Sequence, residues 1–249
     1  MFIPLHDANA LKHIRVPYVT FGIIAINCLI YLSTTVATED LVTAATIGLG
    51  YIPVTIFEDV IRPPTMDIVP GYATYITYAF LHADFWHLTG NMLFLWVFGD
   101  NVEDALGHFK FTVFYIACAA AGALFHGLVV PDSHAPLIGA SGAVAGIVAA
   151  YLILHPRVKV WVLALGRVPL RLPAWILLAL WVLFQFAMLA VMGEDEVSWA
   201  AHVGGILAGA VLVILLRRRN VPILDRTIVT PEGVELKAPT APPTRWGRN

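Results

Sequence analysis

Long apolar stretches recur along this chain, and each is close to the length that crosses a lipid bilayer. A helix needs about 20 residues to span roughly 30 Å of hydrocarbon, because it rises about 1.5 Å per residue. Six stretches reach or approach this length: residues 17–36, 84–102, 109–130, 140–154, 173–192 and 199–216. The pattern therefore predicts six membrane-spanning helices.

The fourth stretch, residues 140–154, is too short for a full crossing. We expect it to begin below one membrane surface and to be surrounded by the other helices, which leaves room for water above it. The long connection 37–83 mixes apolar side chains with acidic residues and prolines, so we expect a folded loop at the membrane interface. Residues 1–16 precede the spans. Residues 217–249 follow them, and their prolines and lack of apolar periodicity are typical of a disordered tail.

Lysine and arginine collect at alternate connections between the predicted spans. They precede the first span, separate the fourth from the fifth and follow the sixth: Lys12, Arg15, Arg157, Lys159, Arg167, Arg171, Arg217, Arg218 and Arg219. Basic residues near span ends stay on the cytoplasmic side, whereas acidic residues such as Glu103 and Asp104 contribute little to orientation. We therefore expect both termini to be cytoplasmic, with Arg62 as the basic exception on the opposite side.

Composition supports a membrane protein and excludes some functions. Of the 249 residues, 59% are hydrophobic and 13% are charged. The mean hydropathy of +0.77 is well above that of an average soluble domain. A net charge of -2 offers no basic face for nucleic acid. Cys28 and Cys118 lie within apolar stretches, so they do not form a disulfide framework.

Polar groups inside predicted spans are energetically expensive, so each is a functional candidate. Ser141 lies at the start of the fourth span and His202 lies about one turn into the sixth. His87 and Asn91 lie about one turn into the second. Because these three spans run in the same direction, all four residues should lie at a similar depth, roughly 5 Å below the outer surface.

Small residues predict that the fourth and sixth spans pack closely. They repeat every fourth residue on both spans, at Gly142, Gly146 and Ala150 and at Ala201, Gly205 and Gly209. Such stripes let helix backbones approach each other. Ser141 borders the first stripe and His202 borders the second, so the packing would bring the serine hydroxyl toward the imidazole.

These residue types suit nucleophilic catalysis. A serine hydroxyl attacks a carbonyl only when a base within about 2.6–3.2 Å takes its proton, which is the role we assign to His202. The side chains of His87 and Asn91, with the Ser141 amide, could hold the oxyanion. No buried carboxylate is evident nearby, so we predict a dyad. Activity should rise with pH as the base loses its proton, at about pH 6.5 for an unperturbed imidazole.

Each candidate also has a simpler interpretation. A serine in a helix rich in glycine and alanine commonly only packs, whereas intramembrane histidines are rarer and more often functional. We interpret His108 and His126, near the ends of the third span, as interfacial. Tryptophans are enriched at membrane interfaces, and we assign no chemistry to Trp161, Trp175, Trp181 and Trp199.

Four short segments together resemble the rhomboid proteases. They read Phe-Leu-His at 80–82, His-Leu-Thr-Gly-Asn at 87–91, Gly-Ala-Ser-Gly at 139–142 and Ala-His-Val-Gly-Gly at 201–205. Their order and spacing match, and the likeness covers residues 17–216. It includes Phe-Gly-Asp-Asn-Val-Glu-Asp at 98–104, which looks like the bacterial type.

The resemblance implies an all-α membrane protein, a bundle of six transmembrane helices with a long interfacial first loop and a short central fourth helix. It implies a serine endopeptidase that cleaves single-span or other membrane proteins within the lipid bilayer and needs no cofactor. A bacterial cytoplasmic membrane would be its location. Nothing in the sequence predicts an oligomeric state.

The resemblance also implies roles for particular residues. Ser141 and His202 correspond to the dyad, and His87, Asn91 and the Ser141 amide correspond to the oxyanion hole. An outer histidine and three glycines of the motifs would have supporting roles: His82, Gly139, Gly142 and Gly205. Some members stack a tyrosine on the catalytic histidine. This chain has Ala145 at that position, so what orients the imidazole stays open.

Two other hypotheses compete with a protease. A rhomboid-like protein that binds transmembrane helices without cleaving them would fail to react with a fluorophosphonate, although such relatives lack the serine or the histidine. A metal site built on His82, His87 and His202 is weaker, since no carboxylate lies beside these histidines and the HExxH motif is missing. Cleavage that survives a chelator would count against it.

Overall fold

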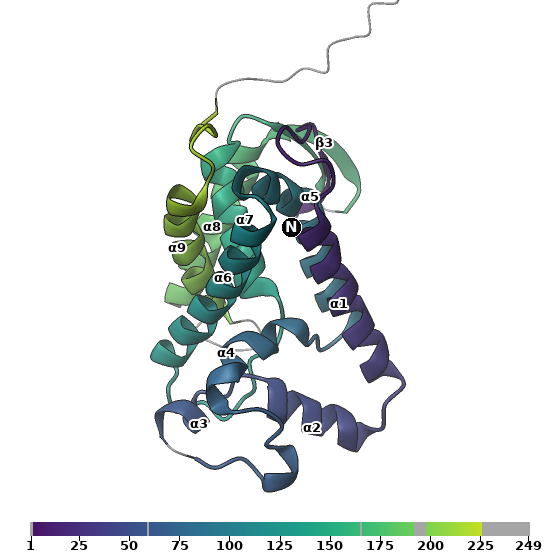
Figure 1. Cartoon of the computed structure of the whole chain (residues 1–249), viewed down its shortest axis with the longest axis vertical. Coiled ribbons are helices and arrows are strands. Elements are labelled where there is room, and N and C mark those ends of the chain that lie inside the picture. The colour runs from purple at the N-terminus through teal and green to yellow at the C-terminus, as the bar shows by residue number, and fades with distance from the viewer. Residues whose placement is uncertain (1, 59, 165, 192–197, 226–249) are drawn as a thin grey trace, which may run out of the picture.

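The computed structural model describes residues 2–58, 60–164, 166–191 and 198–225. This part of the chain is mostly helical (Figure 1). A long helix lies at each of the six predicted spans, within a few residues of its expected bounds: α1 (Tyr18–Thr35), α5 (Phe85–Leu106), α6 (His108–Val129), α7 (Ser141–Leu154), α8 (Ala174–Val191) and α9 (Trp199–Leu216).

Four of the long helices, α1, α6, α8 and α9, are long and apolar enough to cross a membrane. The helix α7 is apolar but has 14 residues. The last two turns of α5 carry the acidic residues Asp100, Glu103 and Asp104. Crossing by all six helices therefore stays a prediction.

The predicted first loop is folded into short helices at one end of the molecule. These are α2 (Glu39–Leu49), α3 (Val54–Phe57), α4 (Thr74–Thr77) and the 3₁₀ helices η1 (Pro64–Met66), η2 (Gly71–Ala73) and η3 (Tyr78–Phe80). The loop is fastened to the segment before α7, because the backbones of Tyr51 and Leu137 exchange hydrogen bonds of 3.1 and 2.8 Å. It thus covers the end at which α7 begins.

The short helix α7 is the centre of the bundle, as expected. Its side chains are almost all buried, with α6 and α9 packed along it. The predicted small-residue stripe explains the close packing: a Cβ on Gly146 would lie 2.5 Å from Cys118 Sγ, and one on Gly209 would collide with the Gly146 carbonyl. The backbones of α7 and α9 are therefore in direct contact.

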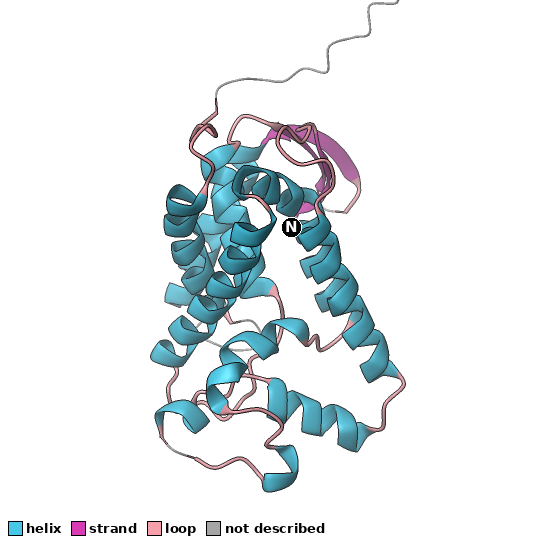
Figure 2. Ribbon diagram, viewed as in Figure 1, coloured by secondary structure: helices cyan, strands magenta, loops and turns pink. Residues whose placement is uncertain are grey.

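A three-stranded antiparallel sheet, which the sequence analysis did not predict, lies at the end opposite the folded loop (Figure 2). It contains β1 (Phe2–Asp7), β2 (Lys159–Ala164) and β3 (Val168–Pro173), in that order. Val160 and Val162 are fully buried, while Trp161 between them is 41% exposed. This alternation is the signal of a strand, and a search for apolar runs of membrane length does not detect it.

The acidic pair Glu103 and Asp104 holds the start of α1. The first amides of a helix lack partners within it, and carboxylates are favourable beside them. Glu103, which is fully buried, accepts hydrogen bonds from the amides of Val19 and Thr20 at 3.0 and 2.8 Å. Asp104 accepts from the amides of the segment before α1, those of Lys12, His13 and Ile14. The pair thus has a capping role that charge counting does not reveal.

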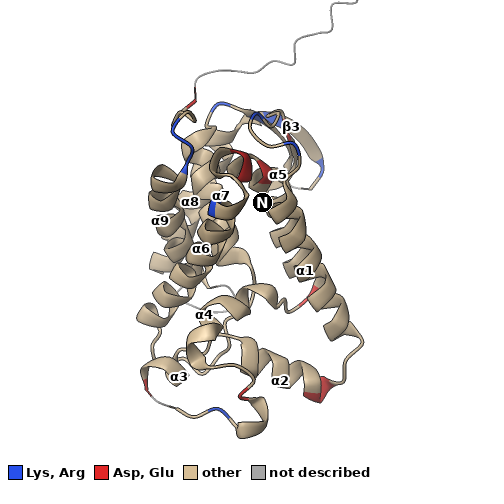
Figure 3. Ribbon diagram, in the orientation of Figure 1, with Lys and Arg blue, Asp and Glu red and all other residues tan. Residues whose placement is uncertain are grey.

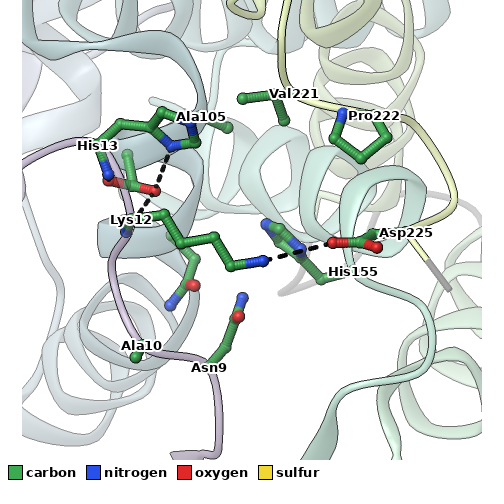
Figure 4. A pocket seen from close by; sticks show the side chains of 11 residues that line it. Asn9, Ala10, Lys12, His13, Ala105, His155, Val221, Pro222 and Asp225 are labelled. Carbon is green, nitrogen blue, oxygen red and sulfur yellow. Dashed lines mark hydrogen bonds and ion pairs between the residues drawn. The ribbon is translucent and has the colours of Figure 1, made fainter. Parts of the chain in front are cut away.

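The described chain continues in contact with the bundle after α9. The amides of Arg218 and Leu224 donate to the carbonyls of Ala105 and Ile153, at 2.9 and 2.8 Å. Asp225 forms an ion pair of 3.6 Å with Lys12 (Figure 4). The prediction of disorder from residue 217 is therefore wrong for 217–225, and residues 226–249 lie outside the described residues.

A buried carboxyl group joins the sheet to the bundle. Asp7, at the end of β1, is 6% exposed, and its Oδ2 accepts hydrogen bonds from Tyr151 Oη at 2.6 Å and Asn101 Nδ2 at 3.2 Å. Burial raises the pKa of Asp7 to about 7, although the bond from Tyr151 opposes the shift. The folded protein thus takes up this proton more readily than the unfolded chain does.

Replacing Asp7 tests this linkage. A pKa raised by folding contributes stability that is complete below about pH 4 and is lost as the pH rises toward 7. Asp7→Asn keeps an oxygen acceptor but cannot lose a proton. We expect its free energy of unfolding, relative to that of the wild type, to be higher at pH 8 than at pH 5 by a few kcal/mol, since one pKa unit corresponds to about 1.4 kcal/mol. Thermal unfolding at both pH values measures the difference. An equal difference at both would contradict the assignment.

Candidate active site

A cavity of about 730 Å³ lies where α5, α7 and α9 begin. Ser141, His202, His87 and Asn91 all line it, so the structure brings together four residues that are far apart in the sequence. The cavity is at the end of the bundle opposite the sheet, because all three helices start there and α7 ends beside β2.

Ser141 is the first residue of α7, and the turn before it depends on glycine. Gly139 has a φ of 118°, a conformation that side chains disfavour. A Cβ there would lie 2.5 Å from His87 Nε2, so the absent side chain lets that imidazole lie against the turn. No side chain of the described residues caps α7, and its first amides, including that of Ser141, carry the positive end of the helix dipole.

His87 and Asn91 lie on one face of α5, because they are four residues apart. Asp84 fixes the start of this helix: its side chain accepts hydrogen bonds from the amides of Trp86 and His87 at 2.7 and 2.9 Å. Asn91 is 7% exposed, and its Nδ2 has no hydrogen-bond partner among the described residues. A buried donor without a partner at a cavity wall is suited to an incoming acceptor.

His82 lies beside His87 and is not among the residues that line the cavity. The two rings meet edge to face, with centroids 5.1 Å apart. Neither ring nitrogen of His82 has a partner among the described residues, and burial lowers the pKa of its imidazole to about 4. His82 therefore packs against His87 as a neutral ring.

Close contact between α7 and α9 places the candidate residues Ser141 and His202 at a similar level. A Cβ on Gly205 would collide with the Gly142 carbonyl, and one on Gly142 would lie 3.3 Å from the Ala201 carbonyl. Gly142 and Ala201 are the chain neighbours of Ser141 and His202. The two helices thus meet at the level of the candidate residues, on one side of the cavity.

The orientation of His202, left open by Ala145, has a structural explanation. His202 Nδ1 lies 2.7 Å from Oε1 of Gln185, a residue of α8 that sequence analysis missed. The rings of Trp181 and Trp199 lie beside the imidazole, with centroids 6.1 and 6.0 Å away, which are contacts that the sequence did not predict. The available signal was a single amide side chain within the apolar stretch that forms α8.

His126, which we interpreted as interfacial, is buried within the protein beside the cavity, and its depth in a membrane stays a prediction. It is 6% exposed, lines the cavity and lies with its Nδ1 2.8 Å from Ser198 Oγ. Ser198 in turn caps α9, since its hydroxyl accepts from the Ala201 amide at 3.1 Å. This contact joins α6 to the start of α9, one turn before His202.

Comparisons with known proteins identify related sequences. The sequence model described as "Rhomboid domain" matches residues 70–219. "Rhomboid protein 1, mitochondrial" of Saccharomyces cerevisiae is 34% identical over 148 residues, which cover 57% of this chain and 41% of that protein. "Rhomboid-like protein 11, chloroplastic" of Arabidopsis thaliana is 30% identical over 177 residues, which cover 64% of this chain and 58% of that protein. "Rhomboid-related protein 3" of Homo sapiens is 28% identical over 163 residues, which cover 62% of this chain and 39% of that protein. The chain thus spans about half the length of these relatives.

The contact between Gly139 and His87 generates a test. We expect Gly139→Ala to strain the turn and displace the imidazole, lowering the stability by about 1–3 kcal/mol and any activity of the site about 10-fold or more. Thermal unfolding and a peptide-cleavage assay measure the two effects. Gly22→Ala is the matched control, because a Cβ on Gly22 meets nothing within 4 Å. Equal behaviour of the two variants would contradict the assigned contact.

Proposed function

Because the chain belongs to the rhomboid family, whose sequence model matches residues 70–219, we propose that it is an intramembrane serine endopeptidase. In this proposal it cleaves transmembrane or juxtamembrane peptide bonds of other membrane proteins. One observation carries the proposal: Ser141, His202 and the unpartnered amide of Asn91 line the same cavity.

The proposed reaction uses the residues around this cavity. Ser141 Oγ attacks the scissile carbonyl carbon while His202 Nε2 takes the hydroxyl proton. The carbonyl oxygen becomes an oxyanion, for which His87, Asn91 Nδ2 and the Ser141 amide are the proposed donors. The C–N bond then breaks, and His202 returns the proton to the leaving amine. Water from the cavity hydrolyses the acyl-enzyme with His202 again acting as base.

The distribution of charge supports a membrane orientation. Lysine and arginine gather at the sheet end of the bundle (Figure 3). In the proposed orientation this end is cytoplasmic, together with residues 1–16 and 217–249, and the cavity faces the other side. Residues 17–216 would then form the protease domain, with all six long helices embedded in the bilayer.

The compartment is a separate part of the proposal. The expectation of a bacterial cytoplasmic membrane rests on the style of the motifs, such as the segment 98–104. The relatives named above come from a yeast, a plant and a human, and two are described as mitochondrial or chloroplastic, so they do not support that location.

The central substitutions test the dyad. We expect Ser141→Ala and His202→Ala each to abolish cleavage of a reporter transmembrane substrate, since each removes an atom that exchanges the proton. Purified protein in detergent or nanodiscs serves for the assay, with thermal unfolding as a check on folding. Cleavage by Ser141→Ala at the wild-type rate would refute the proposed nucleophile.

Asn91 offers a graded test of the oxyanion site. Removing one such donor typically lowers the rate about 10²–10³-fold, so we expect Asn91→Ala to show a partial loss. The loss should appear in kcat, because the donor acts on charge that develops in the transition state. An increase in KM with an unchanged kcat would instead assign Asn91 to substrate binding.

A further inference from the structure

Gln185 brings a polar group from a third helix, α8, to the candidate site. Its side chain is buried, at 2% exposure, on a helix that otherwise presents apolar side chains. We propose that Gln185 is a positioning residue that holds His202 in the tautomer able to accept the Ser141 proton. This inference rests on the proposed function. It assigns to Gln185 the orientation of His202, for which a serine–histidine dyad has no third residue.

The orientation of the Gln185 amide follows from its second contact. Gln185 Nε2 lies 3.2 Å from the carbonyl oxygen of Trp181, one turn earlier on α8. A carbonyl oxygen only accepts hydrogen bonds, so the NH₂ group of Gln185 must face it. The Oε1 atom therefore faces His202, 2.7 Å from its Nδ1.

The orientation of the Gln185 amide determines which nitrogen of the His202 imidazole carries the hydrogen. Because Oε1 is an acceptor, His202 Nδ1 must carry the hydrogen of this short bond. A neutral imidazole has one N–H, so Nε2 is left with the lone pair that a general base needs. The rings of Trp181 and Trp199 restrict the plane of the imidazole, so tautomer and orientation are set together.

The contact also acts after proton transfer. Once His202 has taken the Ser141 proton, its Nδ1–H carries part of the positive charge, and the bond to Gln185 becomes a stronger, charge-assisted one. This is the orienting role of the aspartate in a serine-protease triad, performed by a neutral amide. A neutral amide suits a buried position, where an unpaired carboxylate would be costly.

Two substitutions separate positioning from packing. Gln185→Met keeps a side chain of similar length but removes the acceptor, whereas Gln185→Glu keeps an oxygen acceptor and adds charge. We expect Gln185→Met to lower kcat about 10- to 100-fold, with KM within about twofold of the wild type. The acidic limb of its kcat/KM profile should move to lower pH by about half a unit to one unit, because the imidazolium has lost its acceptor.

Gln185→Glu should retain more activity than Gln185→Met above the acidic limb and should move that limb to higher pH. Among the described residues, the other titratable side chains that line the cavity are His87, His126 and Asp84, and they are the same in every variant. Leu183→Met is the matched control on α8, since Leu183 is 64% exposed. Wild-type kcat and an unmoved acidic limb in Gln185→Met would overturn the inference.

The tautomer can be read without any activity. In protein labelled with ¹⁵N-histidine, with His202→Gln for assignment, we expect the wild type to carry its hydrogen on Nδ1 and Gln185→Met to populate both tautomers. A wild-type imidazole protonated on Nε2 alone would overturn the inference whether or not the protein cleaves. A wild type that shows the Nδ1–H tautomer but cleaves nothing would instead refute the proposed function, while the control of the His202 tautomer by Gln185 would still hold.

Discussion

Glycines 142 and 146 on α7 face glycines 205 and 209 on α9, and the two helix backbones touch along this line. No other residue type permits that separation, because a Cβ on Gly205 or Gly209 would collide with a carbonyl of α7. The contact fixes the relative height of Ser141 and His202, which are the chain neighbours of residues in this contact. The cavity and the proposed roles of Ser141, His202 and Gln185 all depend on it.

Polar contacts set the ends of the helices around this centre. Glu103 and Asp104 hold the start of α1, Asp84 caps α5, and Ser198 caps α9. Inside the bundle, polar groups are expensive unless they are hydrogen-bonded. Gln185 satisfies this rule through Trp181 and His202, whereas Asn91 Nδ2 at the cavity has no partner among the described residues. The contrast fits the two proposed roles: Gln185 orients His202, and Asn91 donates a hydrogen bond to the bound substrate.

The sequence predicted features that depend on local periodicity. The positions of the six long helices, the stripe of small residues and the grouping of Ser141 with His202 all follow from helical spacing, which is a local property. The sheet was missed because Val160 and Val162 alternate with exposed residues over a short segment. The contacts of Gln185, His126 and Glu103 were not predicted because they join segments that are distant in the sequence. Such a contact has no signature in the sequence around either partner. The one exception is a single polar residue in an apolar helix, which indicates that a polar partner lies elsewhere in the chain.

The central claim is that Ser141 is a nucleophile activated by His202, and its reactivity can be measured directly. Purified protein treated with a fluorophosphonate and digested for peptide mass spectrometry should carry the adduct on Ser141. The adduct should be lost from His202→Ala when that variant remains folded. An adduct on another serine, or undiminished labelling of Ser141 in His202→Ala, would contradict the account.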